Sequence, residues 1–157
     1  MNLLFFLLFA APHYSLPNPH LTPGAVDSRL IADPSGRPHM VDRVEANLCA
    51  NDFRTGPWRK VSQSEKVKAC RAYGIMTGCP GKNFELDHLI SLEIGGSDAI
   101  TNLWPQPIAE ARIKDHQTED PLPKLVCAGK ISLKDAQTCI STDWVKCSAR
   151  VKLLPRK

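Results

Sequence analysis

The spacing of apolar and polar residues along the 157-residue chain predicts short strands followed by helices. Residues 84–89 (FELDHL) alternate apolar and polar side chains, the period of a strand with one buried face, and extended structure resumes at 103–104 after a glycine-rich turn. Three segments have helical character: 62–73, 108–115 and 132–146. This order predicts an α+β fold built around a β-hairpin and a following helix, with additional helices.

Local signals place the ends of these helices. Ser62 or Ser64 can cap the first, and Gly74 supplies its left-handed stop. Ser132-Leu-Lys-Asp135 approximates a capping box that opens the last helix. The expected buried stripe of that helix consists of Leu133, Ala136, Ile140 and Trp144. Residues 41–48 and 58–61 are expected to be short strands.

The amino-terminal third has a different composition. Residues 3–11 form an uncharged apolar run of the length of a signal-peptide core, too short to cross a bilayer, so residues 1–20 are interpreted as an export signal and the start of an arm. Prolines recur through the segment that follows, which predicts an extended arm over 21–48. The remaining residues, 49–157, are expected to form one domain. An uncleaved anchor or a mispredicted start are the alternatives for the apolar run.

Six cysteines follow that apolar run: Cys49, Cys70, Cys79, Cys127, Cys139 and Cys147. An even number in a small exported domain predicts three disulfides, and sequence alone does not choose among the 15 pairings. Because no C-x-x-C pair occurs, a structural zinc site is the weaker interpretation.

Charge is segregated along the chain, although the net charge is a mild +4. Residues 54–82 carry seven basic residues against Glu65, whereas 85–120 carry eight acidic residues against two basic ones. The segment after Asp143 is purely basic. An acidic centre between basic flanks suits a cation site that also attracts a polyanion, while solvated faces that happen to segregate are the plainer explanation.

Candidate chemistry concentrates at Asp87, His88 and Asn102. An imidazole can accept a proton from water near neutral pH, and a neighbouring carboxylate is a hard oxygen ligand for Mg²⁺ or Ca²⁺. An amide fourteen residues later, across the predicted turn, could fix the orientation of the imidazole. Taken alone, an Asp-His pair more often belongs to a surface strand in which the histidine is merely hydrogen-bonded and has no catalytic role.

A longer pattern surrounds these residues. The run from Glu85 to Asp98 (ELDHLISLEIGGSD), followed by 102–107 (NLWPQP), resembles the core of a secreted or phage-associated branch of the HNH endonuclease superfamily. The likeness extends from Leu21 to Trp144. It implies a ββα-metal fold, a β-hairpin with a long loop and a following helix that together hold one divalent cation, expected to be Mg²⁺ with Ca²⁺, Mn²⁺ or Zn²⁺ as alternatives.

The resemblance also implies roles for single residues. Asp87 becomes a metal ligand, His88 the general base, and Asn102 the residue that orients it. Many relatives complete the metal site with a histidine early in the helix, but 110–115 contains none. Asp115 is the first substitute; Glu110, His116 and Glu119 are the others. Lys114 or Arg112 would contact the scissile phosphate, and the nucleic-acid contacts are expected from Arg59, Lys60, Lys66 and Arg112.

These inferences lead to one principal hypothesis about function. The chain is expected to be a secreted or periplasmic, monomeric, metal-dependent endonuclease that hydrolyses DNA, with RNA as a further substrate, at low sequence specificity. No stable membrane insertion is expected after leader removal. The alternatives are a catalytically weakened relative that acts as a nucleic-acid or surface-binding module, and an exported protein that binds another protein.

Overall fold

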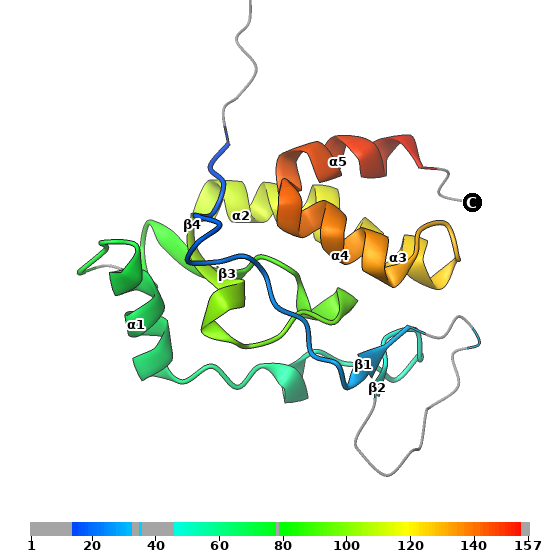
Figure 1. Cartoon of the computed structure of the whole chain (residues 1–157), viewed down its shortest axis with the longest axis horizontal. Helices are drawn as coiled ribbons and strands as arrows, with labels where there is room; N and C mark the ends of the chain where they lie inside the picture. The colour runs from blue at the N-terminus through cyan, green and yellow to red at the C-terminus, as the bar shows by residue number, and fades with distance from the viewer. Residues whose placement is uncertain (1–13, 33–34, 36–45, 78, 155–157) are drawn as a thin grey trace, which may run out of the picture.

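A computed structural model describes residues 14–32, 35, 46–77 and 79–154 of the chain. It has the predicted α+β fold, with two small sheets and a set of short helices (Figure 1). The strands are β1 (Leu30–Ile31), β2 (Ala46–Asn47), β3 (Phe84–His88) and β4 (Leu103–Pro107). The helices are α1 (Gln63–Ala72), α2 (Ile108–Lys114), α3 (Pro121–Cys127), α4 (Leu133–Thr142) and α5 (Trp144–Leu153).

The predicted hairpin and its following helix are present. Strands β3 and β4 pair antiparallel, with Asp87 opposite Trp104 and His88 opposite Leu103. The long connection between them contains the 3-10 helices Leu92–Ile94 and Ile100–Asn102. Helix α2 begins directly after β4 and packs against both strands of the hairpin.

The helices follow their sequence signals closely at their amino-terminal ends. The Ser62 hydroxyl accepts a hydrogen bond from the Glu65 amide, and the Glu65 carboxylate accepts one from the Ser62 amide, which together form a capping box for α1. Gly74 follows the helix at φ +76°, in the left-handed region that favours glycine. The Ser132 hydroxyl caps α4 by accepting from the Asp135 amide, so the predicted capping box is present in its first half only.

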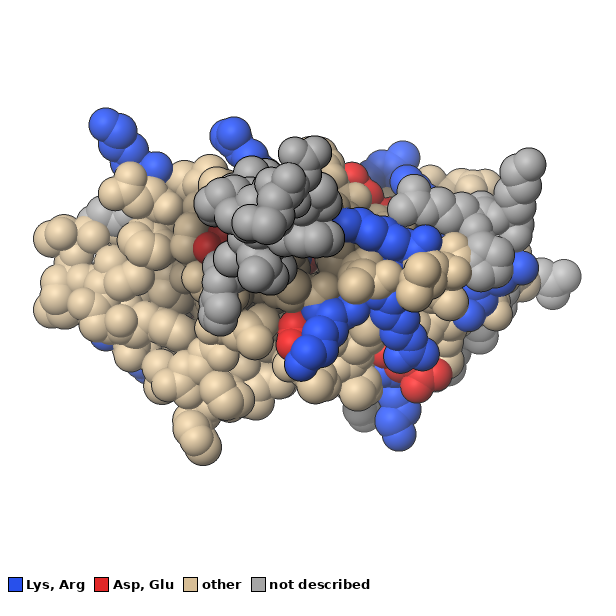
Figure 2. Space-filling view, turned by 90° about the horizontal axis from the view of Figure 1, so that it is seen from above, with Lys and Arg blue, Asp and Glu red and all other residues tan. Residues whose placement is uncertain are grey.

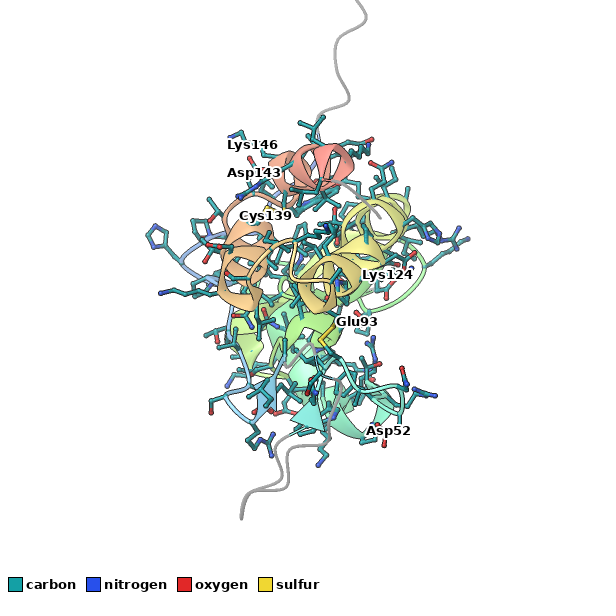
Figure 3. The ribbon with its side chains drawn as sticks, turned by 90° about the vertical axis from the view of Figure 1, so that its right-hand side faces the viewer. Asp52, Glu93, Lys124, Cys139, Asp143 and Lys146 are labelled. Carbon is teal, nitrogen blue, oxygen red and sulfur yellow. A yellow bond between two sulfur atoms is a disulfide. The ribbon has the colours of Figure 1, made fainter. Side chains whose placement is uncertain are left out.

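The predicted single helix over 132–146 is wrong, because Asp143 divides it into α4 and α5. Asp143 is extended (φ −165°) and its carboxylate accepts hydrogen bonds from the amides of Val145 and Lys146, which makes it the N-cap of a new helix. Asp143 and Lys146 lie at the start of α5 in Figure 3, with Cys139 on α4 beneath them. The predicted strand at 58–61 is also wrong: a 3-10 helix (Gly56–Trp58) opens with Pro57, and irregular chain follows.

The core lies between the hairpin connection and the helices α3 to α5. Its fully buried members include Ala136, Ile140 and Trp144, and Leu133 packs against them partly buried, so the predicted stripe is confirmed, with Trp144 now on α5. Trp104 of β4 is 2% exposed and belongs to the same cluster. It is therefore a core residue and not a platform for stacked bases.

The proline-rich segment is extended but packs on the domain. The Trp144 indole donates to the Ser15 carbonyl at 2.9 Å, and Thr22 is buried with its hydroxyl hydrogen-bonded to the Leu103 carbonyl. Strand β1 pairs with β2 in parallel. The described part of the arm is thus held by backbone hydrogen bonds where apolar side chains are few. Residues 41–45 of the predicted strand 41–48 lie outside the described residues.

Three disulfides close the domain: Cys49–Cys127, Cys70–Cys79 and Cys139–Cys147. They use all six cysteines, which confirms the prediction of three bridges. Such a set is typical of proteins that fold in an oxidising environment. The predicted export signal lies outside the described residues. Among the residues that are described, none of the helices has the length and apolar character required to cross a bilayer.

Candidate active site

An open cavity of about 290 Å³ lies between the end of β3, the hairpin connection and the helical segment after α2. Its lining is dominated by carboxylates and histidines. The lining residues are Arg59, Glu85, Asp87, His88, Ser91, Leu92, Glu93, Asp115, His116, Glu119 and Asp120. Asp87, His88 and Asp115, the predicted metal and base residues, therefore share one cavity.

Three carboxylates converge in this cavity. One ligand oxygen from each of Asp87, Asp115 and Glu119 lies within 4.8 Å of the others. Two oxygens bound to one Ca²⁺ ion, each at roughly 2.3–2.6 Å, can be separated by up to about 5 Å, so the cluster has the size of a cation site. Both the first-choice substitute ligand, Asp115, and one of its alternatives, Glu119, are in this set.

A π-helical turn (η4, Asp115–Glu119) brings these side chains together. In it the Asp120 amide donates to the Asp115 carbonyl five residues earlier, at 2.8 Å. In a regular α-helix, residues five apart are rotated by about 140° from each other, which would separate Lys114 from Glu119. The wider turn places both on the side that faces Asp87, and such turns are frequent at functional sites.

Lys114 lies beneath the cluster and is fully buried. Its ammonium donates to the Asp87 carboxylate at 2.7 Å, to the His88 carbonyl at 2.8 Å, and to Glu119. The prediction that Lys114 contacts the scissile phosphate is therefore wrong, because all three N–H groups are used inside the protein. Lys114 instead holds two of the carboxylates and the end of β3 in place.

The ionisation of the cluster reflects this crowding. Burial raises the pKa of Glu119 to about 8, against the opposing effect of the Lys114 ammonium. Burial and the Asp87 charge also raise the pKa of Asp115. Although burial opposes its charge, the carboxylates of Asp87 and Glu119 hold the pKa of Lys114 above its ordinary value. When all three carboxylates are ionised, the single ammonium of Lys114 leaves part of their negative charge uncompensated, and a further cation would neutralise it.

Ser91 leaves a buried hydroxyl close to this cavity that has no hydrogen-bond partner within the described part of the chain. Ser91 is 2% exposed and is one of the residues that line the cavity. An unpartnered buried hydroxyl costs free energy on the order of 1–3 kcal/mol unless a ligand or a water bonds to it.

His88 is oriented by a residue that the sequence interpretation missed. Its Nε2 atom lies 2.7 Å from the Asp98 carboxylate, which also accepts from the Lys60 amide. Because a carboxylate accepts, Nε2 carries the proton in this arrangement and Nδ1 is free to accept one. Asp98 is the last residue of the ELDHLISLEIGGSD run. An acidic residue at the end of this glycine-rich turn was therefore the sequence signal that could have identified the partner of His88.

Asn102 has a structural role that differs from the predicted one. It is fully buried, and its side chain bonds only backbone groups: it accepts from the Ile90 and Ala25 amides and donates to the Ile90 and Ser97 carbonyls. The prediction that Asn102 bonds the imidazole directly is therefore wrong. By bonding Ile90 and Ser97, the Asn102 side chain ties the end of the hairpin connection back to its start, directly after His88. Gly96 permits this closure, since a Cβ there would lie 1.8 Å from the Ile90 carbonyl oxygen.

The predicted nucleic-acid residues separate into two groups. Arg59 lines the acidic cavity, and Arg59 and Lys66 both border His88. Lys60 contributes its backbone amide to Asp98, and exposed Arg112 lines neither cavity next to His88. Elsewhere, Lys and Arg side chains gather over the right half of the face in Figure 2, above the helices that follow the site.

No family model, curated protein or solved structure matches this chain. The likeness to HNH endonucleases therefore rests on the sequence pattern alone.

Proposed function

We propose that the protein is an exported, metal-dependent endonuclease of the ββα-metal type that hydrolyses DNA, and RNA as a further substrate, with little sequence preference. One observation carries the proposal: His88 and the convergent carboxylates of Asp87, Asp115 and Glu119 line the same cavity. Hydrolysis of a phosphodiester needs a base for water and positive charge at the phosphate, and this cavity offers a place for both.

The residues that would hold the cation are Asp87, Asp115 and Glu119. Hard carboxylate oxygens are the donors that Mg²⁺, Mn²⁺ and Ca²⁺ prefer. When bound, the cation supplies charge neutralisation at the phosphate. Lys114 keeps two of these carboxylates in position and offsets part of their repulsion.

His88 is the general base of the proposed reaction. With Nε2 donating to Asp98, the Nδ1 atom takes a proton from water as the water oxygen forms its bond to phosphorus. The bond from phosphorus to the leaving sugar oxygen breaks, and that oxygen receives a proton from solvent. Asp98 holds the tautomer and stabilises the imidazolium that results.

A second function is favoured by the contacts of Lys114. Its ammonium already neutralises part of the charge on Asp87 and Glu119, as a bound cation would. A protein in which this internal cation replaces the metal would be catalytically weakened and would act as a nucleic-acid or surface-binding module. Turnover that requires a divalent cation and stops with chelator would exclude this alternative.

The decisive experiment is plasmid nicking with Mg²⁺, with and without EDTA, by wild type and His88→Ala. We expect the substitution to reduce the rate by at least about 100-fold, the lower end of the contribution of a general base. His20→Ala, which removes an exposed histidine from the arm, is the matched control and should nick like wild type. Circular dichroism would establish that both variants fold, and equal nicking by His88→Ala and wild type would reject the proposal.

A further inference from the structure

A second, smaller cavity adjoins the first on another side of His88. It has a volume of about 120 Å³ and is lined by Arg59, Val61, Lys66, Leu86, His88 and Leu103. Two members of this lining, Arg59 and His88, also line the acidic cavity. The two cavities are therefore neighbours that share these two side chains.

The charge of the second cavity is opposite to that of the first. Arg59 and Lys66 are its charged lining residues, and no carboxylate lines it. Within the described residues, neither cation forms an ion pair with an acid. Lys66 is half-buried on α1, and Arg59 is exposed and lines both cavities. Two unpaired cations beside a small hollow favour an anion.

The size of the cavity limits what the anion is. Pockets for whole small molecules usually measure roughly 300–1,000 Å³, several times the volume found here. A single phosphate group fits this space, while a complete nucleotide does not. Its bases and sugars would remain outside, in contact with solvent or with the exposed surface of α1.

We infer that this cavity, formed around Arg59 and Lys66, binds the phosphate next to the scissile one in a polynucleotide. The inference rests on the proposed function and extends it to substrate selection. A strand that places one phosphate at the carboxylate cluster passes His88 and offers its neighbouring phosphate to the two cations. The preferred substrate then contains at least two consecutive phosphodiesters, so the enzyme discriminates against dinucleotides and simple phosphodiesters.

The test compares a dinucleotide with a twelve-nucleotide strand for wild type, Arg59→Ala/Lys66→Ala and Lys68→Ala/Arg71→Ala. The last variant removes two exposed charges from α1, the helix that carries Lys66, and neither of these residues lines the cavity. We expect wild type and this control to prefer the longer strand, in kcat/KM, by at least about tenfold, and the cavity variant to lose most of that preference. Equal preference in all three proteins would overturn the inference.

A binding measurement separates this inference from the proposed function. In EDTA, the affinity for the same labelled strand is measured by fluorescence anisotropy at several salt concentrations. We expect the cavity variant to bind on the order of tenfold more weakly, with a salt dependence reduced by about 0.7 in log–log slope, the value for one lost phosphate contact on a single strand. An affinity equal to that of the control would overturn the inference even if the protein cleaves DNA. Weaker binding by the cavity variant, with no cleavage by any of the three proteins, would support the phosphate site while rejecting the proposed function.

Discussion

Replacement of the buried lysine tests the architecture of the site. Lys114→Met keeps the apolar stem and removes the ammonium that bonds Asp87, Glu119 and the His88 carbonyl. Removal of one partner from a buried ion pair costs about 3–5 kcal/mol, because the remaining charges lose their compensation. For a domain of this length that corresponds to a decrease in Tm of about 10–15 °C, measured in EDTA. Lys130→Met, at an exposed lysine after α3, should change the Tm little.

The same variant should gain stability from a divalent cation. With Lys114 absent, Asp87, Asp115 and Glu119 repel one another without an internal counter-charge, so Ca²⁺ should stabilise Lys114→Met more than wild type. A ligand at about one hundred times its Kd adds about 2.7 kcal/mol of stability, enough to restore much of the loss. A Tm of Lys114→Met equal to that of Lys130→Met in EDTA would refute the buried arrangement. If Ca²⁺ raises the Tm of Lys114→Met and of wild type equally, the Lys114 ammonium does not compete with the ion for the three carboxylates.

Three further substitutions probe the positioning of the site and the second half of the domain. Asp98→Ala should lower kcat for DNA cleavage by roughly ten- to a hundredfold with little change in Tm, because His88 loses its orienting carboxylate. Asn102→Ala should lower the free energy of unfolding by about 2–4 kcal/mol in urea titrations, because buried backbone groups lose their partners. Asp143→Ala should cost about 1 kcal/mol at neutral pH by loss of the α5 cap. Burial raises the pKa of Asp143, but hydrogen bonds from Lys146 outweigh it and hold the pKa below its ordinary 3.8, so this difference should disappear as the pH falls through that lowered value.

Controls for these variants come from the exposed surface. Asp52→Ala and Asn51→Ala remove similar side chains from two adjacent exposed positions, and Asp52 lies at the end of the molecule opposite Asp143 in Figure 3. Neither should alter activity or stability appreciably. An Asp98→Ala enzyme as active as Asp52→Ala would show that the imidazole needs no carboxylate. Asn102→Ala as stable as Asn51→Ala would contradict the closure of the hairpin connection, and a difference for Asp143→Ala that persists in strong acid would contradict the lowered pKa.

Local sequence signals predicted much of the fold. The alternation in 84–89 located β3, and serine caps located the starts of α1 and α4, because these features depend on a few neighbouring residues. The same local signals failed at Asp143, where a helical stripe continues through a residue that caps a second helix. The apolar period persists across the break, so periodicity alone does not reveal it.

The candidate site was predictable in part. The sequence pattern singled out Asp87, His88 and Asp115, which line one cavity. The partner of His88 was missed because Asp98 reaches it only when the connection folds back, a closure that depends on Asn102. The contact of Lys114 with Asp87 and Glu119 depends on the π-helical turn at Asp115–Glu119. The sequence pattern did not predict that turn.

The central claim is that three carboxylates beside His88 bind one divalent cation. Crystals soaked in Mn²⁺ and measured at its absorption edge test this claim most directly. We expect one anomalous peak per chain between Asp87, Asp115 and Glu119, and no such peak in Asp115→Asn crystals treated identically. A wild-type cavity with no peak between these carboxylates, or a peak that survives unchanged in Asp115→Asn, would contradict the account.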